Sequence, residues 1–253
     1  MYLQDKNSFM TISSSGDQQK TEKTNFQLLL IDNLKQEIES ARKLDSEKLV
    51  LEIGKIGFSC LHCGKCCRQA FGDNRVMLIP PEIEKIREFT GLSKLELAGP
   101  YVPEPHLETS QHDEPGDGEG RTEDNIHVFG WALRRKTNGD CIFYDESTCR
   151  CRIYPVRPML CKTYPFYLEE LKLCTCECEG LGNPISPEDS RKLAEKLLRR
   201  YVSELEDVLA VYENYVDFKR GDHGPEHVKE NLGKGGYIYV VHDSTGATII
   251  VER

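Results

Sequence analysis

The sequence predicts an α+β fold, in which a small irregular cysteine-rich domain carries flanking helices and a C-terminal β-hairpin. Four cysteines fall within the eight residues from Cys60 to Cys67. On both sides of this region, apolar residues recur at three- and four-residue intervals, which indicates amphipathic helices. Near the end of the chain, two runs of β-branched and aromatic residues flank the segment Asp243–Gly246, which indicates a hairpin.

The N-terminal half is predicted to contain two helices. The first spans Asn25–Leu44, within a helical segment of residues 24–57. Its apolar stripe consists of Ile31, Leu34, Ile38 and Ala41. A shorter helix should run from Pro80 to Phe89 and end at Gly91, because proline favours the start of a helix and glycine its end.

A long helix is predicted within residues 183–221. Ser186 is a good N-cap, Pro187 suits the first helical position, and the following acidic residues suit the first turn. The helix should run to Phe218 and pack on the Asn25–Leu44 helix. Its apolar stripe consists of Leu197, Tyr201, Leu205, Val208, Tyr212 and Tyr215.

The rest of the chain is predicted to be short strands or irregular. Strands are expected at Val76–Ile79 and His127–Arg134, and a hairpin within residues 235–253. The polar residues 1–23 are predicted to be a disordered tail. Residues 103–125, inside a cysteine-cluster domain spanning 58–182, are predicted to be a flexible loop because they hold almost no large apolar residue.

Composition excludes several classes of protein. The formal net charge is −9 and the pI is about 5.4, which argues against a general nucleic-acid binder. The longest aliphatic run, Leu28–Ile31, is too short to span a membrane, and the polar N-terminus lacks an export signal. We therefore expect a cytoplasmic protein. In a reducing compartment, its eleven cysteines are better metal ligands than disulfides.

The cysteines occur in a series of separated motifs. The first, Cys60-x2-Cys63-x2-Cys66-Cys67, has the two-residue gaps typical of metal ligands. The second half contains Cys141-Ile-Phe143 and then Cys151 through Arg157-Pro158 to Cys161. It continues with Tyr164-Pro165-Phe166 and closes with Cys178 through Gly182.

In this order, from about Phe58 to Gly182, the motifs resemble the YkgJ-type cysteine-cluster (CxxCxxCC) family, which is described as zinc- or iron-chelating. The resemblance implies a metal-centred domain with eight ligands: Cys60, Cys63, Cys66, Cys67, Cys141, Cys151, Cys161 and Cys178. Cys149, Cys174 and Cys176 fall outside the family pattern, and we expect them to be dispensable for metal binding.

The residues themselves leave the metal open. Eight thiols suffice for two four-thiolate centres, and either zinc or a 4Fe-4S cluster takes four thiolates. Adjacent Cys66 and Cys67 should point in different directions in regular backbone, so they either serve two centres or one of them is spare. Arg157 is expected to pair with a local carboxylate. The alternative is that it donates to a ligand sulfur or a substrate anion.

Two function classes remain open at this point. The first is a metal-binding protein that holds an iron-sulfur cluster or zinc in an accessory, metal-handling or electron-transfer role. The second is a metal-dependent modification enzyme, because the same cluster occurs in flagellin lysine N-methylase. No cosubstrate motif is present in the sequence, which favours the first class.

The expected partner is a metal ion or cluster, with no nucleic acid and no membrane. The sequence identifies neither a protein partner nor an oligomeric state.

Overall fold

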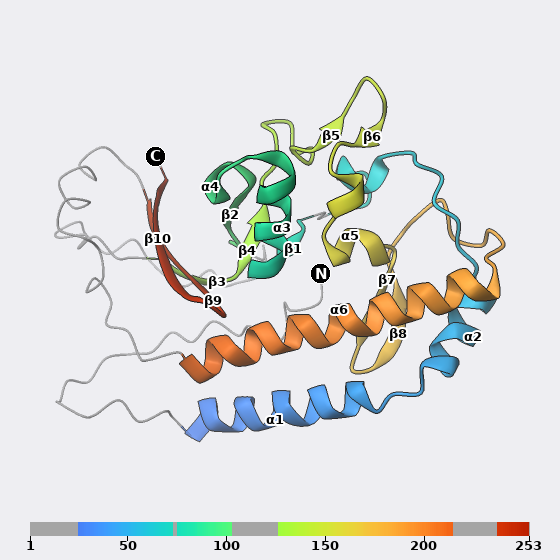
Figure 1. Ribbon diagram of the computed structural model, residues 1–253, viewed down its shortest axis with the longest axis horizontal. Coiled ribbons are helices and arrows are strands. Elements are labelled where there is room, and N and C mark those ends of the chain that lie inside the picture. The colour runs from blue at the N-terminus through green and yellow to red at the C-terminus, as the bar shows by residue number, and fades with distance from the viewer. Residues whose placement is uncertain (1–24, 73–74, 103–125, 215–236, 253) are drawn as a thin grey trace, which may run out of the picture.

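The structure is a computed structural model that describes residues 25–72, 75–102, 126–214 and 237–252. The predicted tail of residues 1–23, the predicted loop of residues 103–125 and the predicted helix beyond Asn214 lie outside the described residues. Helices and small sheets alternate along the chain (Figure 1), so the predicted α+β class is confirmed.

The helices flank the cysteine-rich region in the chain. The α-helices are α1 (Asn25–Arg42), α2 (Ser46–Ile56), α3 (Pro80–Thr90), α4 (Lys94–Leu97), α5 (Met159–Thr163) and α6 (Pro187–Asn214). Two 3-10 turns are η1 (Lys65–Cys67) and η2 (Tyr154–Val156). None of the described helices is both long enough and apolar enough to cross a membrane.

The predicted helices are confirmed where the structure describes them. Helix α3 ends at Gly91, whose N–H donates to the Arg87 carbonyl at 2.8 Å. Helix α6 begins after Ser186, whose hydroxyl accepts from the Asp189 N–H at 3.0 Å, as expected of an N-cap. Helix α2 was not predicted as a separate element. It begins after Asp45, a second N-cap.

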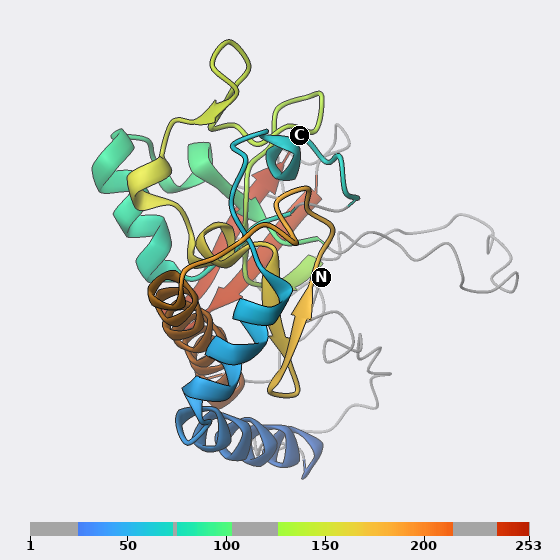
Figure 2. The ribbon, with the colours of Figure 1, turned by 90° about the vertical axis from the view of Figure 1, so that its right-hand side faces the viewer.

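Helices α1 and α6 lie side by side at one edge of the molecule, as predicted (Figures 1 and 2). All four residues of the predicted α1 stripe are buried. Leu34 and Ile38 of α1 share a core cluster with Leu205 of α6. A second cluster joins α2 and α6 to strand β7 (Phe166–Glu169) through Ile53, Leu197 and Phe166, and neither cluster contains a cysteine.

The strands of the described residues form two three-stranded sheets and two separate two-stranded sheets. One sheet has the order β1 (Met77–Leu78), β4 (Trp131–Leu133), β2 (Ala98–Pro100) and is antiparallel. The other has the order β10 (Gly246–Glu252), β9 (Tyr237–Asp243), β3 (Ile126–Phe129). The hairpins are β5 (Tyr144–Asp145) with β6 (Arg150–Cys151), and β7 with β8 (Lys172–Thr175).

The predicted strand His127–Arg134 is wrong as a single element. Gly130, at φ 92°, separates β3 from β4, and the two strands join different sheets. Strand β3 pairs in parallel with β9, in a register that places Phe129 opposite His242. The C-terminal hairpin is confirmed, with Gly246 paired to Asp243. The hairpin shares a core with strand β4, because Val241 and Ile250 lie in one cluster with Trp131 and Leu133.

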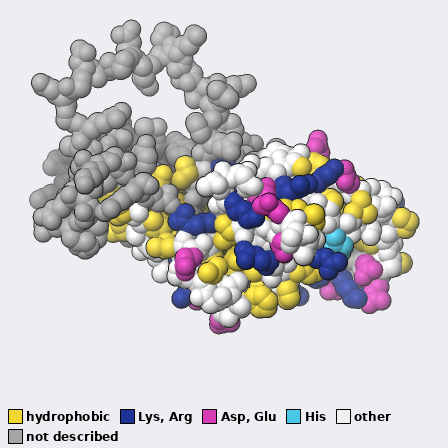
Figure 3. All heavy atoms as spheres, turned by 90° about the horizontal axis from the view of Figure 1, so that it is seen from above, with side chains coloured by type: hydrophobic (Ala, Val, Ile, Leu, Met, Phe, Trp, Pro, Cys, Tyr) yellow, Lys and Arg dark blue, Asp and Glu magenta, His cyan; other side chains and the backbone are white. Residues whose placement is uncertain are grey.

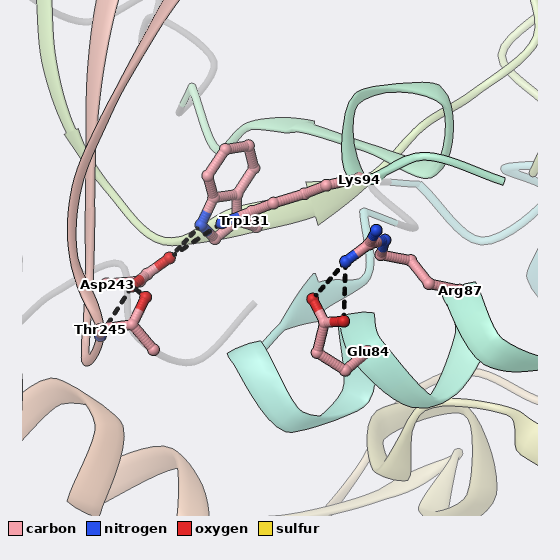
Figure 4. A network of polar contacts seen from close by, with 6 residues as sticks. All are labelled: Glu84, Arg87, Lys94, Trp131, Asp243 and Thr245. Atoms are coloured by element: carbon pink, nitrogen blue, oxygen red, sulfur yellow. Dashed lines mark hydrogen bonds and ion pairs between the residues drawn. The ribbon is translucent and has the colours of Figure 1, made fainter.

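A buried carboxylate connects this hairpin to the central sheet. Asp243 accepts from the Trp131 indole N–H at 2.6 Å and from the Thr245 N–H at 2.8 Å. The Lys94 ammonium lies 3.3 Å from the same carboxylate and 3.8 Å from the centre of the Trp131 ring. Figure 4 shows this network beside the exposed Glu84–Arg87 pair of α3. The network ties the hairpin to the core that the cysteine segments pack against.

Candidate metal centre

The first cysteine segment forms a compact turn. Gly64 adopts a left-handed conformation (φ 69°), and a Cβ there would lie 2.5 Å from the Tyr144 ring, so only glycine fits. The turn η1 follows, and the Sγ atoms of Cys66 and Cys67 lie 4.0 Å apart. The expectation that these side chains point in different directions is therefore wrong. It assumed regular backbone, whereas these two residues lie in a short 3-10 turn that follows the left-handed Gly64.

Backbone pairing brings the second cysteine segment to the first. The Cys141 N–H donates to the Cys67 carbonyl at 2.9 Å. Cys151 then lies opposite Tyr144 in the β5–β6 hairpin. Cys161 follows on the short helix α5. In Figures 1 and 2, the β5–β6 hairpin and the η1 turn lie at the side of the molecule away from α1, whereas α5 packs on α6.

Cys178 reaches the first segment by a separate contact. The Ser59 N–H donates to the Gly180 carbonyl at 3.0 Å, and Phe58 forms a β-bridge with Leu181. A Cβ on Gly180 would lie 2.4 Å from the Ser59 carbonyl oxygen, so this approach requires glycine. Lys65 forms an ion pair with Glu179. These contacts place the residue pair Cys60 and Cys63 beside Cys178.

The contacts divide seven of the eight family-matched cysteines into two neighbouring groups, and Cys66 is near both. We define the inner group as Cys67, Cys141, Cys151 and Cys161, all of which are partly buried. The outer group is Cys60, Cys63 and Cys178, of which Cys60 is exposed. Cys66 is exposed and lies close enough to affect the ionisation of members of both groups.

The thiols influence one another's protonation. The contact with the Cys67 thiol lowers the pKa of Cys66 to about 7, although burial acts in the opposite direction. Burial raises the pKa of Cys141 to about 11, and burial together with the charges of Cys141, Cys66 and Cys151 raises the pKa of Cys161. Without a cation, these inner thiols therefore favour the protonated form. A bound metal cation would favour the thiolate form instead.

The three unmatched cysteines have other neighbours. Cys149 interacts with Tyr144 and the Glu146 carbonyl, and Cys174 lies 4.0 Å from a Glu169 oxygen. Cys176 lies closer to the site than the sequence suggests, since both it and Cys178 raise the pKa of Tyr164, after the larger effect of burial. None of the eleven cysteines, all of which lie in the described part of the chain, forms a disulfide.

The donor chemistry suits a soft metal, although the ligands are not yet in a coordinating arrangement. Among the described residues, no three Cys, His, Asp or Glu side chains converge closely enough to hold a metal ion. Eight thiols from five stretches of chain nevertheless lie in one region. Thiolate sets of this kind fit zinc or an iron–sulfur cluster, whereas calcium and magnesium prefer oxygen. Binding would require the thiols to draw closer together.

This side of the molecule mixes charges of both signs. Figure 3 views the structure from the side of η1 and the β5–β6 hairpin, and lysine and arginine side chains there form separate patches between hydrophobic and acidic ones.

Residues 59–179 match the model of the CxxCxxCC family, whose description is "Putative zinc- or iron-chelating domain". The match covers just under half of the chain. The match confirms the resemblance drawn from the motifs, and the CxxCxxCC domain includes both cysteine groups.

The other comparisons are more limited. An uncharacterized protein of Methanocaldococcus jannaschii is 40% identical over 35 residues, which cover 14% of this chain and 19% of the relative. The similarity thus spans far less than two thirds of that relative. No solved structure matches the chain.

Glu82 is a supporting residue that the sequence analysis missed. It lies on α3, and one of its carboxylate oxygens accepts from the Met159 N–H, at the start of α5, at 2.6 Å. The other accepts from the Ile79 N–H at 3.3 Å. Glu82 thereby holds the helix that carries Cys161. Its position in the first turn of α3 was visible in the sequence, but its partner 77 residues away was not.

We expect Glu82→Ala to lower the free energy of unfolding by about 1–3 kcal/mol, because two backbone N–H groups lose their acceptor. Chemical denaturation of the loaded protein measures this. Glu88→Ala is the control, since Glu88 is exposed on the same helix. An equal effect of both substitutions would show that Glu82 does not anchor α5.

Proposed function

We propose that the chain is a metal-binding protein that holds metal through two four-thiolate sites and serves an accessory role in metal handling or electron transfer. Cys67, Cys141, Cys151 and Cys161 would form one site. Cys60, Cys63, Cys66 and Cys178 would form the other. The observation that supports this proposal is the set of backbone contacts that bring the distant segments carrying Cys60 to Cys67, Cys141, Cys151 and Cys178 together.

The assignment of Cys66 rests on the number of donors. Zinc and 4Fe-4S clusters each take four protein thiolates, and the outer group alone supplies three. Cys66 lies near both groups, whereas Cys67 is tied to Cys141 through the backbone. Cys66 would therefore complete the outer site.

The exposure of the two sites supports an accessory role. Cys60 and Cys66 are exposed, so the outer site is accessible to a metal donor, an acceptor or a redox partner, whereas the inner thiols are partly buried. Eleven cysteines with metal-ligand spacings suit a reducing compartment, and on that ground we infer the cytoplasm. We favour an iron–sulfur cluster over zinc. The side shown in Figure 3 carries charges of both signs, which offers no support for a nucleic-acid partner.

Metal analysis of anaerobically purified protein tests the proposal. We expect iron and sulfide with visible absorption, and about half of the metal should be lost in either Cys63→Ser or Cys161→Ser. The double variant should retain none. Cys149→Ser, Cys174→Ser and Cys176→Ser are matched controls that should keep the wild-type metal content.

Each alternative result has a distinct meaning. Colourless protein with stoichiometric zinc would exclude the iron–sulfur preference. Loss of all metal in one single variant would favour one shared centre over two. Well-folded protein that binds neither metal would exclude the proposed function.

A further inference from the structure

Arg157 occupies an unusual position beside the inner group. It lies between η2 and α5, four residues before Cys161, and Pro158 follows it. The central carbon of its guanidinium group lies 3.7 Å from the centre of the Tyr154 ring. This stacking holds the side chain in place next to the cysteine segments, since a cation over an aromatic face is attracted to it.

Among the described residues, Arg157 does not form the ion pair with a local carboxylate that the sequence predicted. Within the described residues, no Asp or Glu forms a salt bridge with this side chain, whereas several surface arginines have one. Its Nε atom is buried and has no hydrogen-bond partner among those residues. A buried N–H of a charged group without an acceptor is costly, and proteins seldom keep one without a reason.

The Tyr154 ring that Arg157 covers lies 5.8 Å from the ring of His62, so Arg157 is close to the first cysteine segment as well as to its own. In agreement with this position, the positive charge of Arg157 favours the thiolate forms of Cys66, Cys151 and Cys161. These sulfurs come from three separate segments. The Nε atom is shielded from solvent, so its N–H is not available to an anion arriving from solution. A metal-bound thiolate is a strong acceptor that would remain beside it.

We propose that Arg157 is a positioning residue of the inner site, whose Nε–H donates to a ligand thiolate when metal is bound. The inference rests on the proposed function and extends it from the ligands to the group that balances their charge. A four-thiolate site carries net negative charge with either zinc or a 4Fe-4S cluster. A fixed cation that donates to sulfur offsets this charge and holds the ligand in one orientation.

Zinc affinity of the full chain tests this role. The metal-free protein is titrated anaerobically with Zn²⁺ against a competing chelator. We expect Arg157→Met to raise the dissociation constant of the inner site about 10- to 100-fold, the range usual for groups that support metal ligands. Arg157→Lys keeps the charge but loses the Nε–H, and it should recover only part of the affinity.

Arg150→Met is the matched control. Arg150 is exposed and lies next to Cys151, so it tests whether any nearby positive charge has the same effect. We expect its affinity to remain within about twofold of wild type, below the range given for supporting groups.

A second measurement separates this role from simple packing of Arg157 on Tyr154. If the protein carries an iron–sulfur cluster, Arg157→Met should shift its reduction potential to more negative values, because hydrogen bonds to cluster sulfurs raise the potential. Tyr154→Leu, which removes only the ring, should shift the potential less. If Arg157→Met does not fold, the comparison of Arg157→Lys with wild type decides the question.

The outcomes for Arg157 and for the proposed function are distinct. Wild-type protein that binds no metal would exclude the proposed function. If wild-type protein binds metal, but Arg157→Met and Arg157→Lys bind zinc as tightly as wild type and have the same reduction potential, the proposed function stands. In that case only the role of Arg157 is excluded.

Discussion

Removal of metal should loosen the cysteine segments, and Cys161→Ser should loosen those of the inner group, while the helices α1 and α6 stay folded. Binding free energy at structural four-thiolate sites becomes folding free energy, on the order of 10 kcal/mol for zinc. The whole stability of a typical domain is about 5–15 kcal/mol. The segments that meet at the inner group therefore depend on the metal, because Cys67 and Cys141 are separated by 73 residues (141 − 67 − 1).

The α1–α6 pair has its own source of stability. Leu34, Ile38 and Leu205 form an apolar cluster without cysteine, and Phe166 of β7 lies in a second such cluster with α2 and α6. Burial of these side chains does not require metal. We therefore expect β7 to persist with the helices although it lies inside the CxxCxxCC domain.

Amide hydrogen exchange, with and without a chelator, measures this difference. Protection should fall in residues 58–72 and 139–161 and persist in α1 and α6. Cys149→Ser is the control and should exchange like wild type. If residues 58–72 and 139–161 remain as protected without metal as with it, metal does not organise this region.

Asp243→Ala should be among the most damaging single substitutions outside the cysteines. The Asp243 side chain is 1% exposed, and its loss leaves the buried Trp131 indole N–H without its acceptor. It also leaves the Lys94 ammonium, which is 26% exposed, without its carboxylate. Breaking a buried charged network of this kind costs about 3–5 kcal/mol. Because Lys94 is partly solvated, we expect the lower end of that range.

The same carboxylate predicts a pH dependence. Burial acts to raise the pKa of Asp243, but hydrogen bonds from Thr245 and Trp131 and the charge of Lys94 outweigh it and lower the pKa. A lowered pKa in the folded state means that Asp243 stabilises the protein above about pH 4, its unfolded value. This contribution is lost as the pH falls through the folded pKa.

Urea denaturation at several pH values checks both statements. The difference in unfolding free energy between wild type and Asp243→Asn should shrink below about pH 4. Glu84→Ala is the control for Asp243→Ala, since its ion pair with Arg87 is exposed (Figure 4) and should contribute less than about 1 kcal/mol. If Asp243→Ala costs no more than Glu84→Ala, the network does not anchor the hairpin.

The elements that were predictable from the sequence are those specified by neighbouring residues. Helices α1, α3 and α6 follow from apolar periodicity and from caps such as Ser186, and the hairpin β9–β10 follows from its turn. Each of these signals lies within one turn of helix or one pair of strands. The gathering of the matched cysteines likewise followed from motifs that occur in a fixed order.

The features that were missed depend on partners distant in the chain. The parallel pairing of β3 with β9 joins residues more than 100 positions apart, and no local pattern specifies it. The contact of Glu82 with Met159 is of the same kind. Gly130 was read as part of a strand because the apolar residues around it continue on both sides. The side-by-side sulfurs of Cys66 and Cys67 were missed because a 3-10 turn was not foreseen.

The place of β9 and β10 in the core also has a consequence for synthesis on the ribosome. Val241 and Ile250 belong to the same cluster as Trp131 and Leu133, against which Cys141 and Cys151 pack. A ribosome adds about 5–20 residues per second, so roughly 4–15 s separate the translation of Cys178 from that of Glu252. Throughout this interval all eight thiols have been made while the core beneath the inner group is still incomplete. The nascent chain thus presents its reactive sulfurs before it can enclose them, and protection from oxidation or from the wrong metal must come from the surroundings during that time.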